Sequence, residues 1–231
     1  MARTNTIQEI EDIHTRTFGR GARVIGVTGP KNQSGVTTIS KSLATRCALG
    51  GQNSLLLDMS RGPGDKRATD QHGISDPAQS GQNIWKAQGG YDVLPINPTG
   101  QDKYRFRDAR SLTEMIRNEL SQYDQVIVDL APMPDIGEAA VPAGIGASAC
   151  DAVILVARTY AVTQSEVEDA VKSLADNEAK IAGLVMNDQN APTVGQELIR
   201  EFERISWMLP KGVKEFVERK IASTKVLNTK I

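Results

Sequence analysis

The segment from Gly29 to Thr38 carries the residues whose types and spacing could perform chemistry. It follows an apolar run, Val24 to Val27, and leads into a helical pattern, so backbone N–H groups and a helix N-terminus would face a bound phosphate. The Thr37 hydroxyl stands where a phosphate-binding loop places its magnesium ligand. Val36, however, occupies the lysine position of that pattern, where a mobile ammonium must reach the β and γ phosphates. A strand-to-helix turn without a ligand is therefore a competing interpretation.

Polar residues also stand at the ends of the later apolar runs, namely Asp58, Asp129, Arg158 and Asn187. In an open parallel sheet the carboxyl ends of the strands share one edge, and ligands bind there. A single Asp or Asn at a strand end is also a common turn former or helix cap. Because several converge on one edge, the pattern favours a ligand site over a set of unrelated turns.

The elements that would position these residues alternate along the chain. The apolar runs are continuous, as in strands covered on both faces: Val24 to Val27, Leu55 to Leu57, Val126 to Val128, Ala152 to Ala157 and Ala182 to Met186. Helical periods separate them, and capping boxes at Ser111 to Glu114 and Thr163 to Glu166 would open two of the helices. We therefore predict an α/β fold, a single doubly wound, mostly parallel sheet flanked by helices.

We expect residues 1–20 to form a helical lead-in and residues 21–231 to form one domain of the P-loop NTPase type. Residues 61–90 contain many glycines and no clear period, which predicts a long loop or a small insertion. Trp207 to Leu209 could form a last strand. Lys211 to Ile231 has the pattern of a basic amphipathic helix, which could lie on lipid or in a partner groove, or pack its apolar stripe on the sheet.

Composition narrows the function classes. The net charge of −1 gives no general attraction to nucleic acid or anionic lipid, so we expect no nucleic-acid partner. The two histidines and two cysteines lie far from any catalytic or metal-binding pattern. No stretch approaches the roughly 18 apolar residues of a membrane span, and we expect a cytoplasmic protein.

The order of the motifs resembles the cytoplasmic domain of bacterial tyrosine kinases of the capsular exopolysaccharide family, which are relatives of the MinD and ParA ATPases. The likeness covers roughly residues 20–220 and rests on Val24 to Lys31, Ser34 to Thr38, Leu55 to Asp58, Tyr91 to Pro95, Tyr123 to Asp129, Cys150 to Val156 and Gly183 to Asn187.

The resemblance implies roles for individual residues. Lys31 matches the signature lysine of a deviant phosphate loop, Asp58 the aspartate of a second acidic motif, and Asp129 the Walker B aspartate. Asn187 matches a position near the adenine. The implied catalytic residues are Asp58 and Asp129, the implied magnesium ligands are Thr37 and Asp129, and the implied nucleotide-binding residues are Lys31, Ser34, Gly35, Val36, Thr37, Thr38 and Asn187.

Three positions depart from the family pattern. Val36 replaces the phosphate-binding lysine, Ser60 stands where a second aspartate is usual, and Asn32 stands where a small residue is expected. The tyrosine-rich tail of such kinases has no counterpart, since the last tyrosine is Tyr160. We therefore expect ATP or ADP with magnesium to bind weakly or not at all, and catalysis to be very weak or absent.

The resemblance implies a pseudokinase-like component of exopolysaccharide biosynthesis or export, of the capsule or holdfast type. Such a protein would work peripherally at the inner membrane through a polysaccharide co-polymerase or export protein embedded there, and it could form a homo-oligomer. Two alternatives stay open. One is an active ATPase of the MinD or ParA type, in which Lys31 partly replaces the lost lysine. The other is a residual kinase that phosphorylates tyrosines of another protein.

Overall fold

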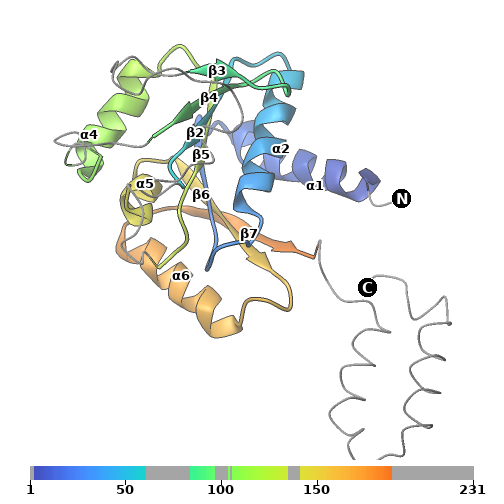
Figure 1. Cartoon of the computed structure of the whole chain (residues 1–231), viewed down its shortest axis with the longest axis vertical. Helices are drawn as coiled ribbons and strands as arrows, with labels where there is room; N and C mark the ends of the chain where they lie inside the picture. The colour runs from blue at the N-terminus through green and yellow to red at the C-terminus, as the bar shows by residue number, and fades with distance from the viewer. Residues whose placement is uncertain (1–2, 61–83, 97–103, 105, 135–140, 189–231) are drawn as a thin grey trace, which may run out of the picture. The chain divides into compact units, whose positions relative to one another are not determined.

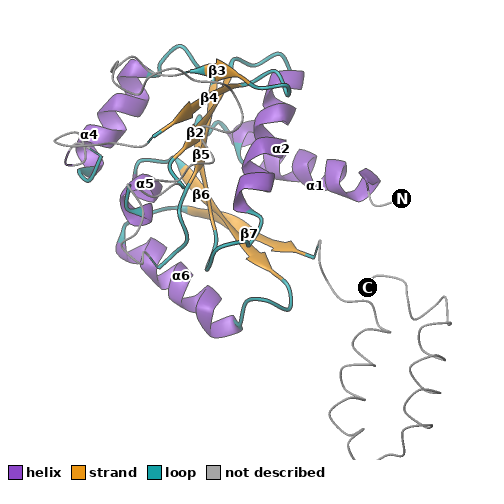
Figure 2. Cartoon of the chain, in the orientation of Figure 1, coloured by secondary structure: helices purple, strands orange, loops and turns teal. Residues whose placement is uncertain are grey.

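The computed structural model describes residues 3–60, 84–96, 104, 106–134 and 141–188. The chain divides into two compact units, Met1–Asn187 and Asp188–Ile231, and the fold described below is that of the first. It is a seven-stranded sheet with helices on both faces (Figures 1 and 2). The strands are β1 (Val24–Thr28), β2 (Ser54–Asp58), β3 (Trp85–Lys86), β4 (Asp92–Pro95), β5 (Gln125–Asp129), β6 (Ala152–Arg158) and β7 (Ile181–Asn187).

The strand order is β3-β4-β2-β5-β1-β6-β7, and every neighbouring pair is parallel except β3 with β4. The helices are α1 (Arg3–Arg16), α2 (Val36–Leu49), α4 (Ala109–Glu114), α5 (Ala143–Ser148) and α6 (Gln164–Asp176). Two short elements add to them, a 3₁₀ turn η1 (Phe18–Arg20) and a π-helical turn η3 (Met115–Glu119). The predicted fold class, a mostly parallel α/β sheet flanked by helices, is confirmed.

Helices α1 and α2 cover one face of the sheet, and α4, α5 and α6 cover the other (Figure 1). Successive strand side chains point to opposite faces, so Ile127 of β5 packs on the α1 and α2 side while Val126 and Val128 pack on the other. All three are completely buried. This two-sided burial explains why the central strands are continuous apolar runs rather than alternating ones.

Strand β7 differs from that expectation. The run Ala182 to Met186 was predicted to be covered on both faces, yet Leu184 and Met186 are 48% and 57% exposed. In the described part of the chain β7 is an edge strand whose neighbour is β6. A continuous apolar run indicates a strand, but it does not distinguish the centre of a sheet from its edge.

Two local predictions need correction. The N-cap of helix α4 lies three residues earlier than predicted, at Asp108 instead of Ser111, because the Asp108 carboxylate accepts the Ser111 backbone N–H at 2.8 Å. The expected loop over 61–90 also contains a strand, since Trp85–Lys86 pairs with β4. The remainder of that loop up to residue 83, together with Trp207 to Leu209 and Lys211 to Ile231, lies outside the described residues.

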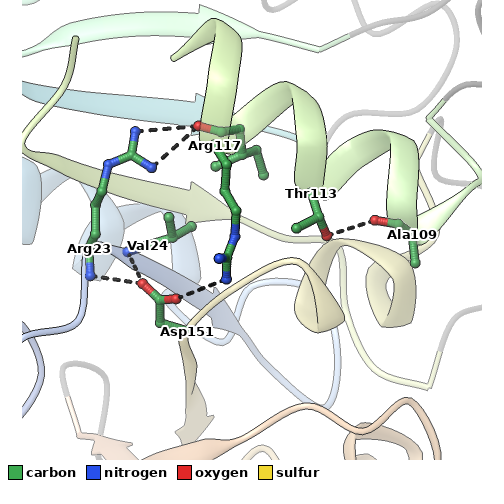
Figure 3. A network of polar contacts seen from close by, with 7 residues as sticks. Arg23, Val24, Ala109, Thr113, Arg117 and Asp151 are labelled. Atoms are coloured by element: carbon green, nitrogen blue, oxygen red, sulfur yellow. Dashed lines mark hydrogen bonds and ion pairs between the residues drawn. The ribbon is translucent and has the colours of Figure 1, made fainter. Parts of the chain in front are cut away.

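A polar network joins the start of β1 to helical turns about 100 residues away (Figure 3). The Arg23 guanidinium donates hydrogen bonds to the carbonyls of Ile116, Leu120 and Tyr123, at 2.6 Å for Leu120 and 3.1 Å for Tyr123. The Asp151 carboxylate accepts the backbone N–H groups of both Arg23 and Val24 at 2.9 Å. The hydrogen bonds from Arg23 satisfy carbonyls in η3 and just after it, where a helix leaves such groups without partners of its own.

Both cysteines are free thiols inside the fold. Cys47 is completely buried on the α1 and α2 side of the sheet. Cys150 packs against the opposite core. Burial raises the pKa of the Cys47 thiol to about 12 and holds the pKa of Cys150 above its usual range. None of the helices in the described ranges has the length and apolar character that a membrane crossing requires.

Candidate functional site

The predicted acidic residues meet at one edge of the sheet. Asp58 ends β2 and Asp129 ends the neighbouring β5, and the two are direct register partners. On its other side β5 pairs with β1, where Asp129 lies opposite Val27, one residue before the end of that strand. The loop that follows β1 therefore leaves the sheet beside both carboxylates, as the sequence predicts.

The loop has a specific backbone shape that depends on glycine. Gly35, the residue before α2, has a φ of +100°, and Gln33 also lies in the left-handed region at 63°. The Ser34 hydroxyl donates to the Lys31 carbonyl at 2.8 Å and closes the turn. A Cβ on Gly29 would lie only 2.7 Å from the Val156 carbonyl oxygen, so the chain needs glycine there for close approach.

Asn187, at the end of β7, reaches this loop across the sheet edge. Its side-chain amide donates to the Ser34 carbonyl at 2.9 Å and lies where a Cβ on Gly35 would have to go. The structure thus brings Asn187 together with the loop residues. Its implied place beside an adenine stays a prediction.

The start of α2 exposes hydroxyls but presents no cation. Val36 is the first residue of the helix, and its half-buried side chain packs against the core on the α1 and α2 side. Thr37 and Thr38 are exposed in the first turn. The first N–H groups of a helix have no carbonyl partner within that helix, so they can bind an anion, while the apolar Val36 side chain offers no donor to a phosphate.

Lys31, the cation that the loop does contain, forms an ion pair within the chain. Its ammonium lies 2.7 Å from a carboxylate oxygen of Glu166, in the first turn of α6. Glu166 also takes part in the predicted capping box with Thr163, which is confirmed. The hydrogen bond from Lys31, followed by those from Thr163, lowers the pKa of the Glu166 carboxyl to about 2.

The acidic side of the site is buried. Asp58 is 6% exposed and Asp129 is 1% exposed. Ser60, which replaces a second aspartate, donates to one oxygen of Asp58 from its backbone N–H at 3.2 Å and from its hydroxyl at 2.9 Å. Carboxylate and hydroxyl oxygens suit magnesium, so Asp129 and Thr37 have the right chemistry for that ion beside a phosphate.

A pocket of about 300 Å³ adjoins the loop and is lined by Pro30, Lys31, Asn32, Pro132, Pro134, Glu166 and Asp169. Sequence reasoning identified Lys31 here, but it treated Glu166 only as a helix cap and missed Asp169. A signal was present, because a capping box directly after an apolar strand places its glutamate at the ligand edge of a parallel sheet.

No protein-family model matches the chain. It is similar to the tyrosine-protein kinase Etk of Escherichia coli K12, with 31% identity over 180 residues that cover 71% of this chain and 23% of Etk. It is also similar to the tyrosine-protein kinase CpsD of Streptococcus pneumoniae, with 28% identity over 193 residues that cover 73% of this chain and 77% of CpsD. The chain thus matches less than a quarter of the length of Etk but most of CpsD.

Solved structures agree with the fold. The kinase domain of Escherichia coli ETK superposes with a TM-score of 0.63 at 23% identity, over 81% of this chain and 78% of that one. MinD from Pyrococcus horikoshii, in complex with Mg-ADP, superposes with a TM-score of 0.54 at 17% identity, over 84% of this chain and 76% of that one. Both likenesses concern the architecture of the sheet and its helices.

Proposed function

Because the chain belongs to the bacterial tyrosine kinase family of MinD-like and ParA-like P-loop proteins, we propose that it is a pseudokinase-like member of that family. One observation carries the proposal. The first residue of α2 is Val36, whose side chain packs into the core where the family pattern requires a lysine on the phosphates.

The expected loss of affinity is large. Hydrogen bonds to charged groups contribute about 1.5 to 3 kcal/mol each, and roughly 1.4 kcal/mol is a factor of ten in affinity. The absence of one or two such bonds weakens nucleotide binding by about tenfold to about twenty-thousand-fold. The transition state of phosphoryl transfer loses more than the ground state, since its equatorial oxygens carry the developing charge.

Weak nucleotide binding is compatible with the rest of the site. ATP or ADP would meet the backbone N–H groups at the start of α2, and its magnesium ion would be held by Thr37 and Asp129, with Asp58 on the adjacent strand. Asn187 would border the base. MinD, a structural neighbour, binds Mg-ADP in the same architecture.

The cellular role follows from family resemblance. We place the protein in exopolysaccharide biosynthesis or export, of the capsule or holdfast type, where it would act peripherally at the inner membrane through an embedded co-polymerase or export protein. In this role the protein contributes binding to its partner rather than catalysis, and self-association is compatible with it.

Calorimetric titration with Mg-ADP and Mg-ATP tests the proposal. The wild type should bind weakly or not at all and show no ATPase activity, whereas Val36→Lys should gain about tenfold or more in affinity. Val36→Met is the matched control, because it supplies a long unbranched side chain without the charge, and it should gain nothing. Submicromolar ADP affinity in the wild type, or a folded Val36→Lys protein that binds no better, would contradict the proposal.

Kinase activity has its own test. Incubation with magnesium and ATP should leave the protein free of phosphotyrosine. The exposed Tyr104 and Tyr160 are the tyrosines to monitor by mass spectrometry, since their side chains are accessible. Stoichiometric phosphate on either residue, or on a candidate partner, would instead support a residual kinase. A dimer that forms only with ATP would support the ATPase alternative.

A further inference from the structure

The ion pair between Lys31 and Glu166 joins two segments that are 135 positions apart, the phosphate loop and the first turn of α6. Its atoms are 2.7 Å apart, and the two side chains are 44% and 39% exposed. An exposed pair of this kind contributes little to stability. Its position is what matters, because Lys31 is the remaining cation of a loop that has lost a lysine at position 36.

Glu166 is held in place for this contact by its own helix. One carboxylate oxygen accepts the Thr163 backbone N–H at 2.8 Å and its hydroxyl at 3.1 Å, and the other oxygen accepts Lys31. The Thr163 hydroxyl in turn receives the Glu166 backbone N–H. The capping box therefore holds Glu166 in one rotamer independently of Lys31. Because of this, Glu166 loses little side-chain entropy when the ion pair forms.

Side-chain contacts also hold the loop at its other end. Ser34 donates to the Lys31 carbonyl, and Asn187 donates to the Ser34 carbonyl. Together with the ion pair, these contacts join the loop to β7 and α6.

We propose that Glu166 is an internal anion that occupies Lys31 in place of a nucleotide phosphate, so that the phosphate loop is held in a self-liganded, autoinhibited state. This inference rests on the proposed function, because it assumes that the loop binds phosphate. A nucleotide phosphate would therefore compete with the Glu166 carboxylate for the Lys31 ammonium. Glu166 is a positioning residue in this scheme and takes part in no chemical step.

The variant Glu166→Gln separates the two tasks of this side chain. Glutamine still serves the capping box, because Gln and Glu are both accepted at that position, but it carries no charge to hold Lys31. Glu168→Gln is the matched control, since it removes a carboxylate from the same helix that bonds Gln164 instead. Thermal unfolding of all variants verifies that the fold is kept.

The first readout is the reactivity of the Lys31 amine toward an acylating reagent, measured on the full chain by mass spectrometry with the exposed Lys41 as internal reference. Glu166→Gln should raise the Lys31 rate relative to Lys41, and Glu168→Gln should leave it unchanged. Equal Lys31 rates in wild type and Glu166→Gln would overturn the inference whatever the protein does with nucleotides.

The second readout is the affinity for Mg-ADP in the Val36→Lys background, where binding is measurable. Adding Glu166→Gln should tighten Kd by about threefold to tenfold. In the Glu166→Gln background, Lys31→Met should abolish that gain in affinity. When Glu166 is present, Lys31→Met should change Kd by less than about twofold.

The outcomes separate the two claims. If Val36→Lys binds Mg-ADP but Glu166→Gln adds nothing, only the self-liganded state is refuted. If Glu166→Gln tightens binding equally with and without Lys31, simple charge repulsion by Glu166 explains the effect and the inference is again overturned. If Val36→Lys binds no better than wild type, the proposed function itself fails.

Discussion

Gly35 and Asn187 depend on each other at the phosphate loop. Gly35 has a left-handed φ, and a Cβ there would collide with the Asn187 side-chain amide, which donates a hydrogen bond to the neighbouring Ser34 carbonyl. A side chain on Gly35 would therefore act twice. It would strain the backbone, and it would displace a group that holds the loop.

Comparing Gly35→Ala with Gly51→Ala measures these two effects separately. Gly51 also has a positive φ, +79°, but a Cβ there meets nothing within 4 Å. We expect Gly51→Ala to lower the free energy of unfolding by about 1 to 2 kcal/mol through backbone strain alone. Gly35→Ala should cost about 1 kcal/mol more because of the lost Asn187 bond. Urea unfolding measures both, and equal losses would show that Asn187 does not support the loop.

Part of this site could be predicted from residue types alone. Asp58, Asp129 and Thr37 follow from strand ends and loop order, since a parallel sheet gathers those positions at one edge. The capping box after β6 indicates that Glu166 lies at this edge, but its pairing with Lys31 could not be predicted. The pairing depends on where the first turn of α6 lies relative to a loop far away in sequence, and many acidic residues satisfy the composition equally well.

At the scale of elements, the first turn of α6 stabilises its helix and also presents Glu166 to the loop. The capping box was predictable because its signal is local, a Thr and a Glu three residues apart ahead of an apolar period. The start of α4 was not predictable, because Asp108 and Ser111 are both residue types that cap helices and the sequence pattern does not show which of them does so. In the structure Asp108 is the N-cap, since its carboxylate accepts the Ser111 N–H.

The α6 cap gives a prediction at this scale. Thr163→Ala removes the hydroxyl that accepts the Glu166 N–H, so we expect the free energy of unfolding to fall by about 1 kcal/mol. Thr113→Ala is the control, because its hydroxyl bonds the Ala109 carbonyl within a helix and its loss should stay within about 0.5 kcal/mol. Chemical unfolding monitored by circular dichroism measures the difference, and similar values for the two variants would argue against the cap.

At the scale of the whole molecule, the Arg23 network joins the start of the central strand to the α4 face (Figure 3). Leu120, whose carbonyl accepts Arg23 at 2.6 Å, is itself completely buried. Asp151, which directly precedes β6, accepts the backbone N–H groups of Arg23 and Val24 at the start of β1. Three segments that are distant in sequence are therefore joined by hydrogen bonds at the amino end of β1, while the phosphate loop follows the carboxyl end of that strand.

This network predicts unequal effects for two arginines. Arg23→Met keeps an apolar side chain of similar length, but it removes the donor to the carbonyls of Ile116, Leu120 and Tyr123. We therefore expect the free energy of unfolding to fall by about 2 to 4 kcal/mol. Arg117→Met should lose less than about 0.5 kcal/mol, since Arg117 is 67% exposed and its ion pair with Asp151 spans 3.8 Å. Equilibrium unfolding in urea tests the order, and the reverse order would refute the structural role of Arg23.

The architecture as a whole was more predictable than its edges. Central strands such as β1 and β5 are buried on both faces, so hydrophobicity alone identifies them. The position and burial of the two outer strands depend on which elements lie beside them, and the local sequence pattern does not carry that information. Hence β3, a two-residue strand, was not predicted, and the exposure of β7 was not foreseen.

The burial of Cys47 and the partial burial of Cys150 have a practical consequence for spectroscopy. The thiolate is the reactive form of cysteine, and the raised pKa values of Cys47 and Cys150 keep both side chains protonated at neutral pH. We therefore expect Cys47 and Cys150 to react slowly with maleimides, so an introduced cysteine can be labelled without replacing either of them. A fluorophore attached through Asn32→Cys, on the exposed face of the phosphate loop, would report movements of that loop alone.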